Sequence, residues 1–210
     1  MKARLLLVFL MFAATVAFAG DTTALRPPKG ARVAIVTFED LQCPDCARAE
    51  FILTDAVKET GVPLVRHDFP LPQHSWSFDA HVIARYLDTK SPKIGEEYRH
   101  WCFVNQPSIT KDNLRGLSER FAEEHKVKLP ENVDPTGKLA ALVKADFALG
   151  QKVGVGHTPT IYVVSDSLRG QPFVEVVNRT QLVQMVNDMK KQVAAEKPEP
   201  TKKSINRKAK

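Results

Sequence analysis

Cys43-Pro44-Asp45-Cys46 is the most informative motif of this 210-residue chain. It follows an apolar run, Val33 to Phe38, and it precedes apolar residues at helical spacing. Two thiols three positions apart at the start of a helix can close into a disulfide with little backbone movement. The helix N-terminus also stabilises the first sulfur as a thiolate, the form that attacks disulfides. The stretch therefore predicts a thiol–disulfide redox centre.

The residues around this stretch predict a βαβ unit. Val33 to Phe38 is apolar and rich in β-branched residues, which is typical of a strand buried on both faces. Pro44 takes the first helical position, where its missing N–H costs nothing, and Gly61 is expected to end the helix as a C-cap. Val62 to Arg66 is the second predicted strand of the unit, and such a crossover is right-handed.

Residues 76–149 change in character. They contain helical periodicity interrupted at prolines, and no strand pattern. The predicted helices are Trp76–Thr89, Pro92–Asn105, Lys111–His125 and Pro135–Gln151. This region is therefore predicted to be an all-helical insertion.

The chain after the insertion predicts a hairpin and a last helix. A glycine-rich loop, 153–160, leads into the apolar run Ile161–Val164, and the alternating run Phe173–Val177 follows after a turn. Thr180–Ala195 has the apolar spacing of an amphipathic helix. Residues 31–75 and 150–195 are accordingly predicted to form one α/β domain around the insertion.

Both ends of the chain are predicted to lie outside this domain. Lys2 and Arg4 precede an apolar run of 15 residues that ends in Ala17-Phe18-Ala19. This is the pattern of a secretory signal peptide, residues 1–19, cleaved after Ala19. An uncleaved anchor is the alternative, but the run falls short of the roughly 20 residues that span a bilayer. Residues 20–30 are expected to be an extended lead-in, and residues 196–210 a disordered basic tail.

The composition, 43% hydrophobic and 26% charged, is that of a globular protein. The net charge is +6, which on its own suggests a nucleic-acid partner. The positive charge lies mainly at the ends, however, because Lys2 and Arg4 belong to the leader and residues 197–210 carry a net +5. The body, 20–196, carries −1. A basic binding face for nucleic acid is therefore not expected.

The three cysteines make one pair and one left over. A loop as short as that between Cys43 and Cys46 constrains the unfolded chain little, so a redox role is favoured over a structural bridge. Half of a zinc site is another alternative, but it needs two further ligands. Cys102 and scattered histidines do not supply them at paired spacing. Cys102 has apolar neighbours and is expected to be a buried free thiol, with an intermolecular disulfide or an accessory thiol as alternatives.

The order of the predicted elements, with CxxC at the first helix and Thr158-Pro159 before the third strand, resembles the thioredoxin superfamily. It resembles in particular the DsbA-like branch, which carries a helical domain within the thioredoxin fold. The residues that carry the resemblance are Val33–Cys46, Asp68–Pro72 with His74, Tyr98–Gln106 and Gly154–Val163. The resemblance covers residues 31–193 and implies an α/β thioredoxin fold with an inserted all-helical domain.

The resemblance also implies roles for single residues. Cys43 is expected to be the exposed nucleophile and Cys46 the buried partner that resolves mixed disulfides. Pro159 is expected to be a cis proline that faces the thiols, so that Thr158 offers backbone groups to an extended substrate strand. His157 is expected either near the thiols, where it would support a thiolate, or exposed in the loop.

Two positions depart from the family pattern. A buried acid that accepts a proton from the buried cysteine is usual six residues before the nucleophile, where this chain has Thr37. Glu39 lies on the same strand face and either substitutes or, as we expect, is solvated. Asp45 follows Pro44 between the cysteines, and its carboxylate is expected to raise the pKa of the nucleophile. We therefore expect a less oxidising protein than the strong disulfide donors of the family.

The sequence as a whole predicts an exported enzyme, a DsbA-like thiol–disulfide oxidoreductase that acts on protein or peptide thiols and disulfides. No metal, flavin or nucleotide motif is present, so the redox-active Cys43–Cys46 pair is the only expected redox group. Its redox partner is unidentified and can be membrane-bound; a periplasmic location is what the resemblance implies. Two alternatives stay open: a reductase or isomerase kept reduced by a membrane partner, and a non-catalytic module that binds peptides along the Thr158-Pro159 edge.

Overall fold

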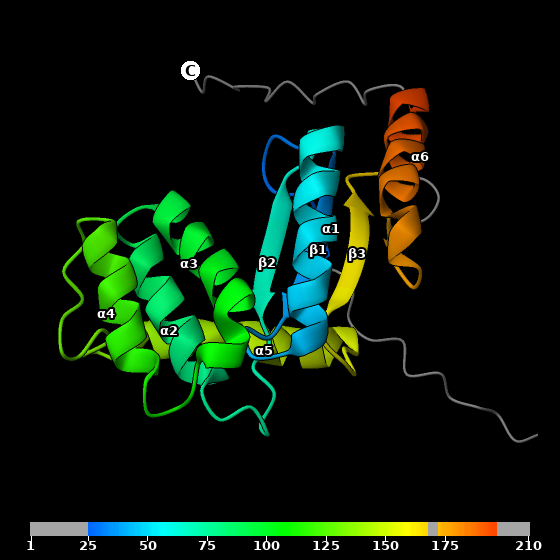
Figure 1. The fold of residues 1–210 in the computed structure, drawn as a ribbon. Helices are drawn as coiled ribbons and strands as arrows, with labels where there is room; N and C mark the ends of the chain where they lie inside the picture. Colours follow the sequence, from blue (N-terminus) through cyan, green and yellow to red (C-terminus); the bar gives the residue numbers. More distant parts are fainter. Residues whose placement is uncertain (1–24, 168–171, 197–210) are drawn as a thin grey trace, which may run out of the picture.

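The computed structural model describes residues 25–167 and 172–196 (Figure 1). The predicted signal peptide and all of the predicted tail except Glu196 lie outside these residues. Within the described ranges, no helix combines the length and the apolar character needed to span a membrane.

The described part of the chain contains one four-stranded sheet with the order β2-β1-β3-β4. Its strands are β1 (Val33–Glu39), β2 (Leu64–Asp68), β3 (Thr160–Ser165) and β4 (Phe173–Glu175). β1 pairs with β2 in parallel and with β3 antiparallel, and β3 pairs antiparallel with β4. The predicted βαβ unit and the predicted hairpin are both present, and no strand end differs from its predicted position by more than two residues.

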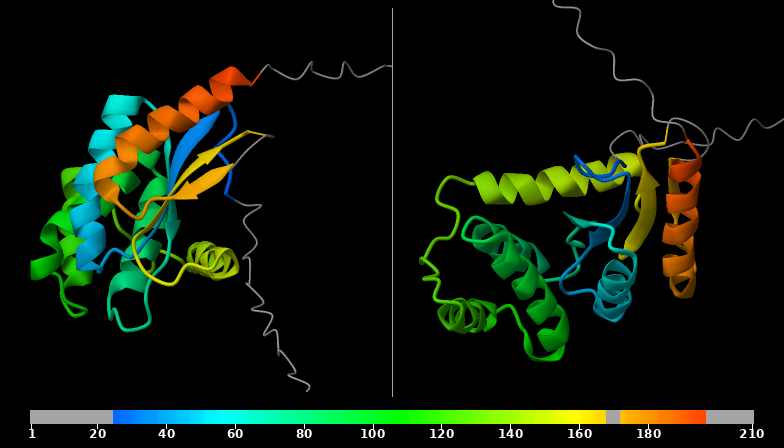
Figure 2. Two further views of the ribbon diagram at one scale, coloured as in Figure 1. Left: turned by 90° about the vertical axis from the view of Figure 1, so that its right-hand side faces the viewer. Right: turned by 90° about the horizontal axis from the view of Figure 1, so that it is seen from above.

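The described residues also form six α-helices. They are α1 (Pro44–Thr60), α2 (Ser77–Asp88), α3 (Pro92–Asn105), α4 (Leu114–Glu124), α5 (Lys138–Val153) and α6 (Leu182–Ala195). Two short 3₁₀ segments, η1 (Gln106–Ser108) and η2 (Arg179–Gln181), precede α4 and α6 respectively. Helices α1 and α6 cover one face of the sheet and α5 crosses the other, while α2, α3 and α4 gather beyond β2 (Figures 1 and 2).

The central strand β1 divides the core into two layers. Val33 and Ile35 pack in the cluster shared with α1 and α6. Val36 and Phe38 pack on the opposite face, against residues of α5. All seven residues of β1 are buried, which confirms the prediction of a strand covered on both sides. Alternation places Thr37 and Glu39 on the α1 face, beneath the thiols.

Helix α1 begins and ends where the sequence predicts. Pro44 is in its first turn, and Gly61 adopts the left-handed conformation (φ 69°) as the C-cap. The Gly61 N–H donates to the carbonyl of Val57 at 2.8 Å, which satisfies an acceptor at the end of the helix.

Helix α5 differs in role from the helices before it. The predicted boundary of the insertion, between residues 149 and 150, falls inside this helix. Its C-terminal half packs on the sheet, where Phe147 stacks on Phe69 with ring centroids 4.5 Å apart. Leu25, in the predicted lead-in, is 1% exposed and lies in the same cluster. The second face of the sheet is therefore closed by a helix that also borders the insertion.

Gly150 allows the close approach of α5 to the sheet. A Cβ atom at this position would lie 2.5 Å from the Phe69 ring and 3.1 Å from the Phe38 ring. We expect Gly150→Ala to lower the free energy of unfolding by about 1–3 kcal/mol through overpacking. Gly116→Ala in α4 is the matched control, because a Cβ there meets open space, and we expect it to leave stability unchanged or slightly raised. Urea unfolding midpoints measure both; equal midpoints would contradict the packing described.

Candidate active site

The two thiols lie at the start of α1. Cys43 is the N-cap, with extended backbone angles (φ −76°, ψ 120°), and Pro44 follows in the first turn. Both cysteines are reduced and buried, with 7% of Cys43 and 2% of Cys46 exposed. Cys43 is thus less exposed than expected, because the Thr158 loop lies over it: Sγ is 3.4 Å from the Thr158 carbonyl oxygen.

Asp40 fixes the turn that joins β1 to α1. It is fully buried, and its carboxylate accepts hydrogen bonds from the Gln42 N–H at 2.7 Å and the Leu71 N–H at 2.6 Å. His74 Nδ1 lies 2.7 Å from the same carboxylate. The Asp40 N–H in turn donates to Cys46 Sγ at 3.4 Å. Asp40 was not predicted as a site residue, although its position directly after a buried strand and before CxxC was a usable signal.

The helical region holds the same turn from the other side. Gln106, in η1, donates from Nε2 to the carbonyls of Leu41 (2.8 Å) and Cys43 (3.0 Å). The Leu41 N–H donates to Nε2 of the fully buried His81 at 3.3 Å. His81 Nδ1 lies 2.8 Å from Asp68 Oδ1. The active-site turn is therefore held by side chains from α2, β2 and η1.

The environments of the two thiols shift their pKa values in opposite directions. A hydrogen bond from the Cys46 thiol is the largest cause that lowers the pKa of Cys43 to about 5, against the opposing effect of burial. The Thr158 side chain and the backbone N–H groups of Cys46 and Asp45 lower the Cys43 pKa further. Burial raises the pKa of Cys46 well above its ordinary value. Cys43 is therefore the thiolate and Cys46 the thiol that donates to it.

Asp45 is ion-paired. Its carboxylate contacts the Arg179 guanidinium through both oxygens, with Nη1 2.9 Å from Oδ1, and Arg48 lies 3.1 Å away. The hydrogen bonds from Arg179 lower the pKa of Asp45. The expectation that Asp45 raises the pKa of the nucleophile took no account of a partner for its carboxylate, and the structure places Arg179 there. Arg179 compensates the charge, and the Asp45 backbone N–H favours the thiolate.

Glu39 is buried rather than solvated, with 2% exposure, so that expectation was also wrong. Its Oε2 accepts from Arg66 Nη1 at 2.7 Å, and Arg66 also contacts Glu50 at 2.9 Å. Glu39 Oε1 and the buried Thr37 hydroxyl have no hydrogen-bond partner among the residues that the structure describes. Burial raises the pKa of Glu39 to about 7, against the lowering effect of Arg66. The negative charge of Glu39 also raises the pKa of Cys46, which links the two groups electrostatically.

The Thr158–Pro159 peptide bond is cis, and both residues are buried. His157 is exposed, with its ring Nδ1 3.3 Å from Thr160 Oγ1, which corresponds to the exposed-loop alternative of the sequence analysis.

Cys102 is fully buried, and burial raises its pKa to about 12. Of the three alternatives for Cys102, the structure therefore agrees with the buried free thiol.

No cluster of three or more His, Cys, Asp or Glu side chains in residues 25–167 and 172–196 is arranged to hold a metal ion.

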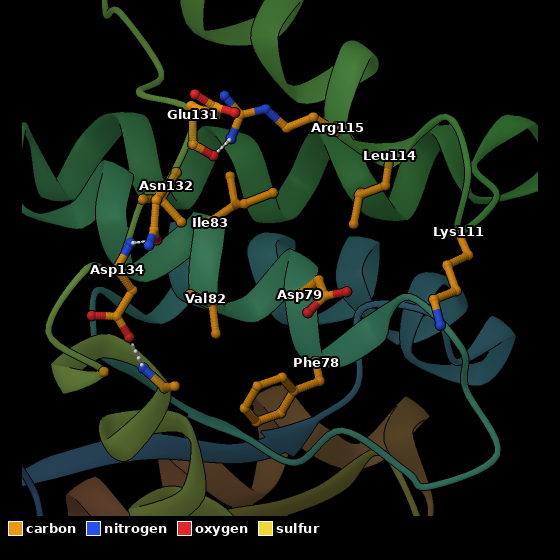
Figure 3. Close-up of a pocket in the computed structure, with 13 residues that line it drawn as sticks. Phe78, Asp79, Val82, Ile83, Lys111, Leu114, Arg115, Glu131, Asn132 and Asp134 are labelled. Carbon is orange, nitrogen blue, oxygen red and sulfur yellow. Dashed lines mark hydrogen bonds between the residues drawn. The ribbon is translucent and has the colours of Figure 1, made fainter.

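A pocket of about 480 Å³ lies on the helical region, between α2, the start of α4 and residues 131–137 (Figure 3). Val82 and Ile83 give it an apolar wall, and Asp79 and Lys111 stand at its side. The two redox cysteines are not among its lining residues.

Residues 24–192 match the family model described as thioredoxin. The chain belongs to the thioredoxin family. This match covers the redox centre, the helical region and the loop before β3, so the family predicted from the sequence is confirmed. No curated protein matches the chain in a sequence search.

Solved structures of DsbA-like proteins share the fold. The thiol-disulfide exchange protein alpha-DsbA2 from Wolbachia pipientis superposes with a TM-score of 0.61 at 16% identity, over 78% of this chain and 85% of that one. BdbD from Bacillus subtilis gives 0.62 at 21% identity, over 84% and 96%. A periplasmic thioredoxin-like protein from Salmonella enterica serovar Typhimurium gives 0.61 at 19% identity, over 78% and 87%. The predicted thioredoxin fold with a helical insertion is thereby confirmed.

The hydrogen bond from Cys46 predicts how the acidity of Cys43 responds to substitution. We expect Cys46→Ala to raise the pKa of Cys43 above about 5, because the thiolate loses its strongest donor. Cys102→Ala, which removes the other buried thiol, should leave the titration unchanged. Ultraviolet absorbance of the thiolate as a function of pH measures both variants. An unchanged pKa in Cys46→Ala would show that this donor does not stabilise the thiolate.

Proposed function

We propose that this protein is an exported thiol–disulfide oxidoreductase that exchanges disulfides with protein substrates through Cys43 and Cys46. The observation that carries the proposal is the pairing of a low-pKa thiolate at the N-cap of α1 with a buried thiol that donates to it. A thiolate is the attacking species in disulfide exchange, and a second thiol within reach is needed to release the bound substrate.

The reaction proceeds by two exchanges of sulfur–sulfur bonds. In the reducing direction, the Cys43 thiolate attacks one sulfur of a substrate disulfide, and the other leaves as a thiolate. Cys46 then loses its proton and attacks Cys43 Sγ, which closes the Cys43–Cys46 disulfide and releases the second substrate thiolate. The substrate gains two electrons that the protein dithiol loses. The oxidising direction is the reverse, starting from a substrate thiolate that attacks the protein disulfide.

The Thr158–Pro159 loop is the proposed binding edge for substrate. Thr158 lies against Cys43, so a substrate chain that pairs with the Thr158 backbone brings its sulfur to the nucleophile. His157, exposed one residue earlier, flanks the same edge. Protein or peptide thiols and disulfides are therefore the proposed substrates. The Wolbachia protein that shares the fold is named as a thiol-disulfide exchange protein.

Glu39 is the proposed acceptor of the Cys46 proton. It is buried on the face of β1 that looks toward α1, its Oε1 lacks a partner in the described structure, and its charge influences Cys46. Its pKa of about 7 suits a group that accepts and returns a proton near neutral pH. Thr37, two residues earlier on the same face, adds a buried hydroxyl that also has no hydrogen-bond partner among the described residues.

The proposed strength as an oxidant follows from the Cys43 pKa. A more stable thiolate favours the reduced protein and makes the disulfide a stronger oxidant. The Cys43 pKa of about 5 lies between about 7 for thioredoxin and about 3.5 for DsbA. We therefore expect a protein less oxidising than strong disulfide donors. This expectation rests on the whole environment of Cys43, because Arg179 compensates the Asp45 charge.

Export is proposed from the first 19 residues, which have the pattern of a signal peptide. The periplasmic thioredoxin-like protein of Salmonella, which shares the fold, is consistent with this compartment. A membrane-bound redox partner is the corresponding proposal for what resets the Cys43–Cys46 pair after each turnover.

A glutathione redox titration of the Cys102→Ser protein tests the proposed function. We expect a midpoint between about −270 mV and −120 mV, the values of thioredoxin and DsbA. Cys43→Ser should abolish the exchange. A wild-type pair that never exchanges with glutathione or a peptide disulfide would contradict the proposal and favour a non-catalytic peptide-binding module. A midpoint at the thioredoxin end of this range would favour a reductase or isomerase kept reduced by a partner.

Glu39→Gln tests the proposed proton acceptor. We expect the attack of Cys46 on the mixed disulfide to slow by about tenfold or more near neutral pH, because the carboxylate that takes the proton is gone. In the wild type this step should accelerate as the pH rises through about 7, and in the variant that transition should disappear. Stopped-flow release of a fluorescent thiol from the mixed disulfide measures the step.

Glu96→Gln is the matched control for Glu39→Gln. Glu96 also pairs with Arg66, at 2.8 Å, but its side chain is 48% exposed. We expect its loss to change the rate less than twofold. Equal slowing in both variants would assign the effect to the Arg66 ion pairs and would contradict proton transfer to Glu39.

A further inference from the structure

Arg179 reaches the redox centre from a distant part of the chain. It lies in η2, before α6, and is separated from Asp45 by 134 positions. Its Nη1 lies 2.9 Å from Asp45 Oδ1, and its Nη2 contacts Oδ2. Two parallel hydrogen bonds of this kind fix the carboxylate in direction as well as in distance. The side chains are partly covered, with 26% of Arg179 and 35% of Asp45 exposed.

The position of Asp45 between the cysteines makes its charge important. A free carboxylate at this place would disfavour a second negative charge on Cys43. The guanidinium of Arg179 cancels that charge. Its hydrogen bond to Asp45 is the largest cause that raises the Arg179 pKa, and the negative charge of Cys43 adds to the increase. Arg48 contacts Asp45 as well, but its side chain is 69% exposed, so solvent screens it more strongly.

We propose that Arg179 is a positioning residue that sets the reduction potential of the Cys43–Cys46 pair by holding Asp45 and compensating its charge. The inference rests on the proposed thiol–disulfide exchange. The thiolate exists only in the reduced protein, because disulfide formation removes its charge. A cation that offsets Asp45 therefore stabilises the reduced form more than the oxidised form. The Asp45–Arg179 pair makes the disulfide a stronger oxidant than Asp45 alone would allow.

Charge compensation predicts effects of opposite sign for the two partners. Arg179→Gln leaves Asp45 uncompensated and should shift the equilibrium with glutathione about tenfold toward the protein disulfide, equal to about 30 mV toward a less oxidising pair. Asp45→Asn leaves Arg179 uncompensated and should shift it in the other direction. The double variant should return to within about threefold of the wild type, because both charges are gone. Arg179→Lys, which keeps the charge, should shift less than Arg179→Gln.

Arg48→Gln is the matched control, since it removes an exposed arginine from the same carboxylate. We expect a change of less than twofold. The equilibrium constants with glutathione are measured for all variants, together with the thiolate titration of Cys43, which should move to higher pH in Arg179→Gln.

An Arg179→Gln equilibrium constant within twofold of the wild type would overturn the proposal. So would a double variant that keeps the whole Arg179→Gln shift, because Arg179 would then act through packing of η2 rather than through Asp45. If the wild type does not exchange with glutathione at all, the proposed function fails. The thiolate titration then still decides about Arg179: an unchanged Cys43 pKa in Arg179→Gln contradicts the inference, and an increase supports it.

Discussion

The redox centre is built on the contact between the Cys43 sulfur and the first turn of α1. The sulfur accepts hydrogen bonds from the backbone N–H groups of Asp45 and Cys46 and from the Cys46 thiol. Such a site works only if the turn before the helix is rigid. The buried carboxylate of Asp40 in this turn accepts a hydrogen bond from the Leu71 N–H. Gln106, in the helical region, donates hydrogen bonds to two backbone carbonyls of the turn. The insertion therefore supports the redox centre as well as covering it.

Two ion pairs shape the chemistry from opposite sides. On the protein interior, Arg66 holds Glu39 beneath Cys46, where burial keeps the pKa of the carboxyl high enough to take up a proton. Near the surface, Arg179 holds Asp45 beside Cys43 and removes a charge that would oppose the thiolate. In the proposed mechanism, the first pair serves the thiol that must lose its proton, and the second serves the thiol that has already lost it. This division matches the two steps of disulfide exchange.

The sequence was sufficient for features that depend on local signals. The strand before CxxC, the Pro44 start and Gly61 end of α1, and four helices within residues 76–153 were predicted from spacing, caps and breaks, and the family followed from their order. The errors concern partners far away in the chain. Glu39 was expected in solvent because its partner Arg66 lies 27 positions later. The effect of Asp45 on Cys43 was judged without Arg179, which lies 134 positions later. Burial of a charge is decided by tertiary contacts, which no local pattern encodes.

The central claim is that Cys43 is a thiolate at neutral and mildly acidic pH because the Cys46 thiol and the backbone of the first turn of α1 donate hydrogen bonds to its sulfur. The rate at which reduced protein forms a mixed disulfide with oxidised glutathione, compared at about pH 8 and about pH 6, tests this most directly. With a Cys43 pKa of about 5, the thiolate fraction stays near its maximum, and the rate should change less than about twofold. A fall of about seventyfold, as expected for a thiol with the ordinary pKa of about 8.5, would contradict the account.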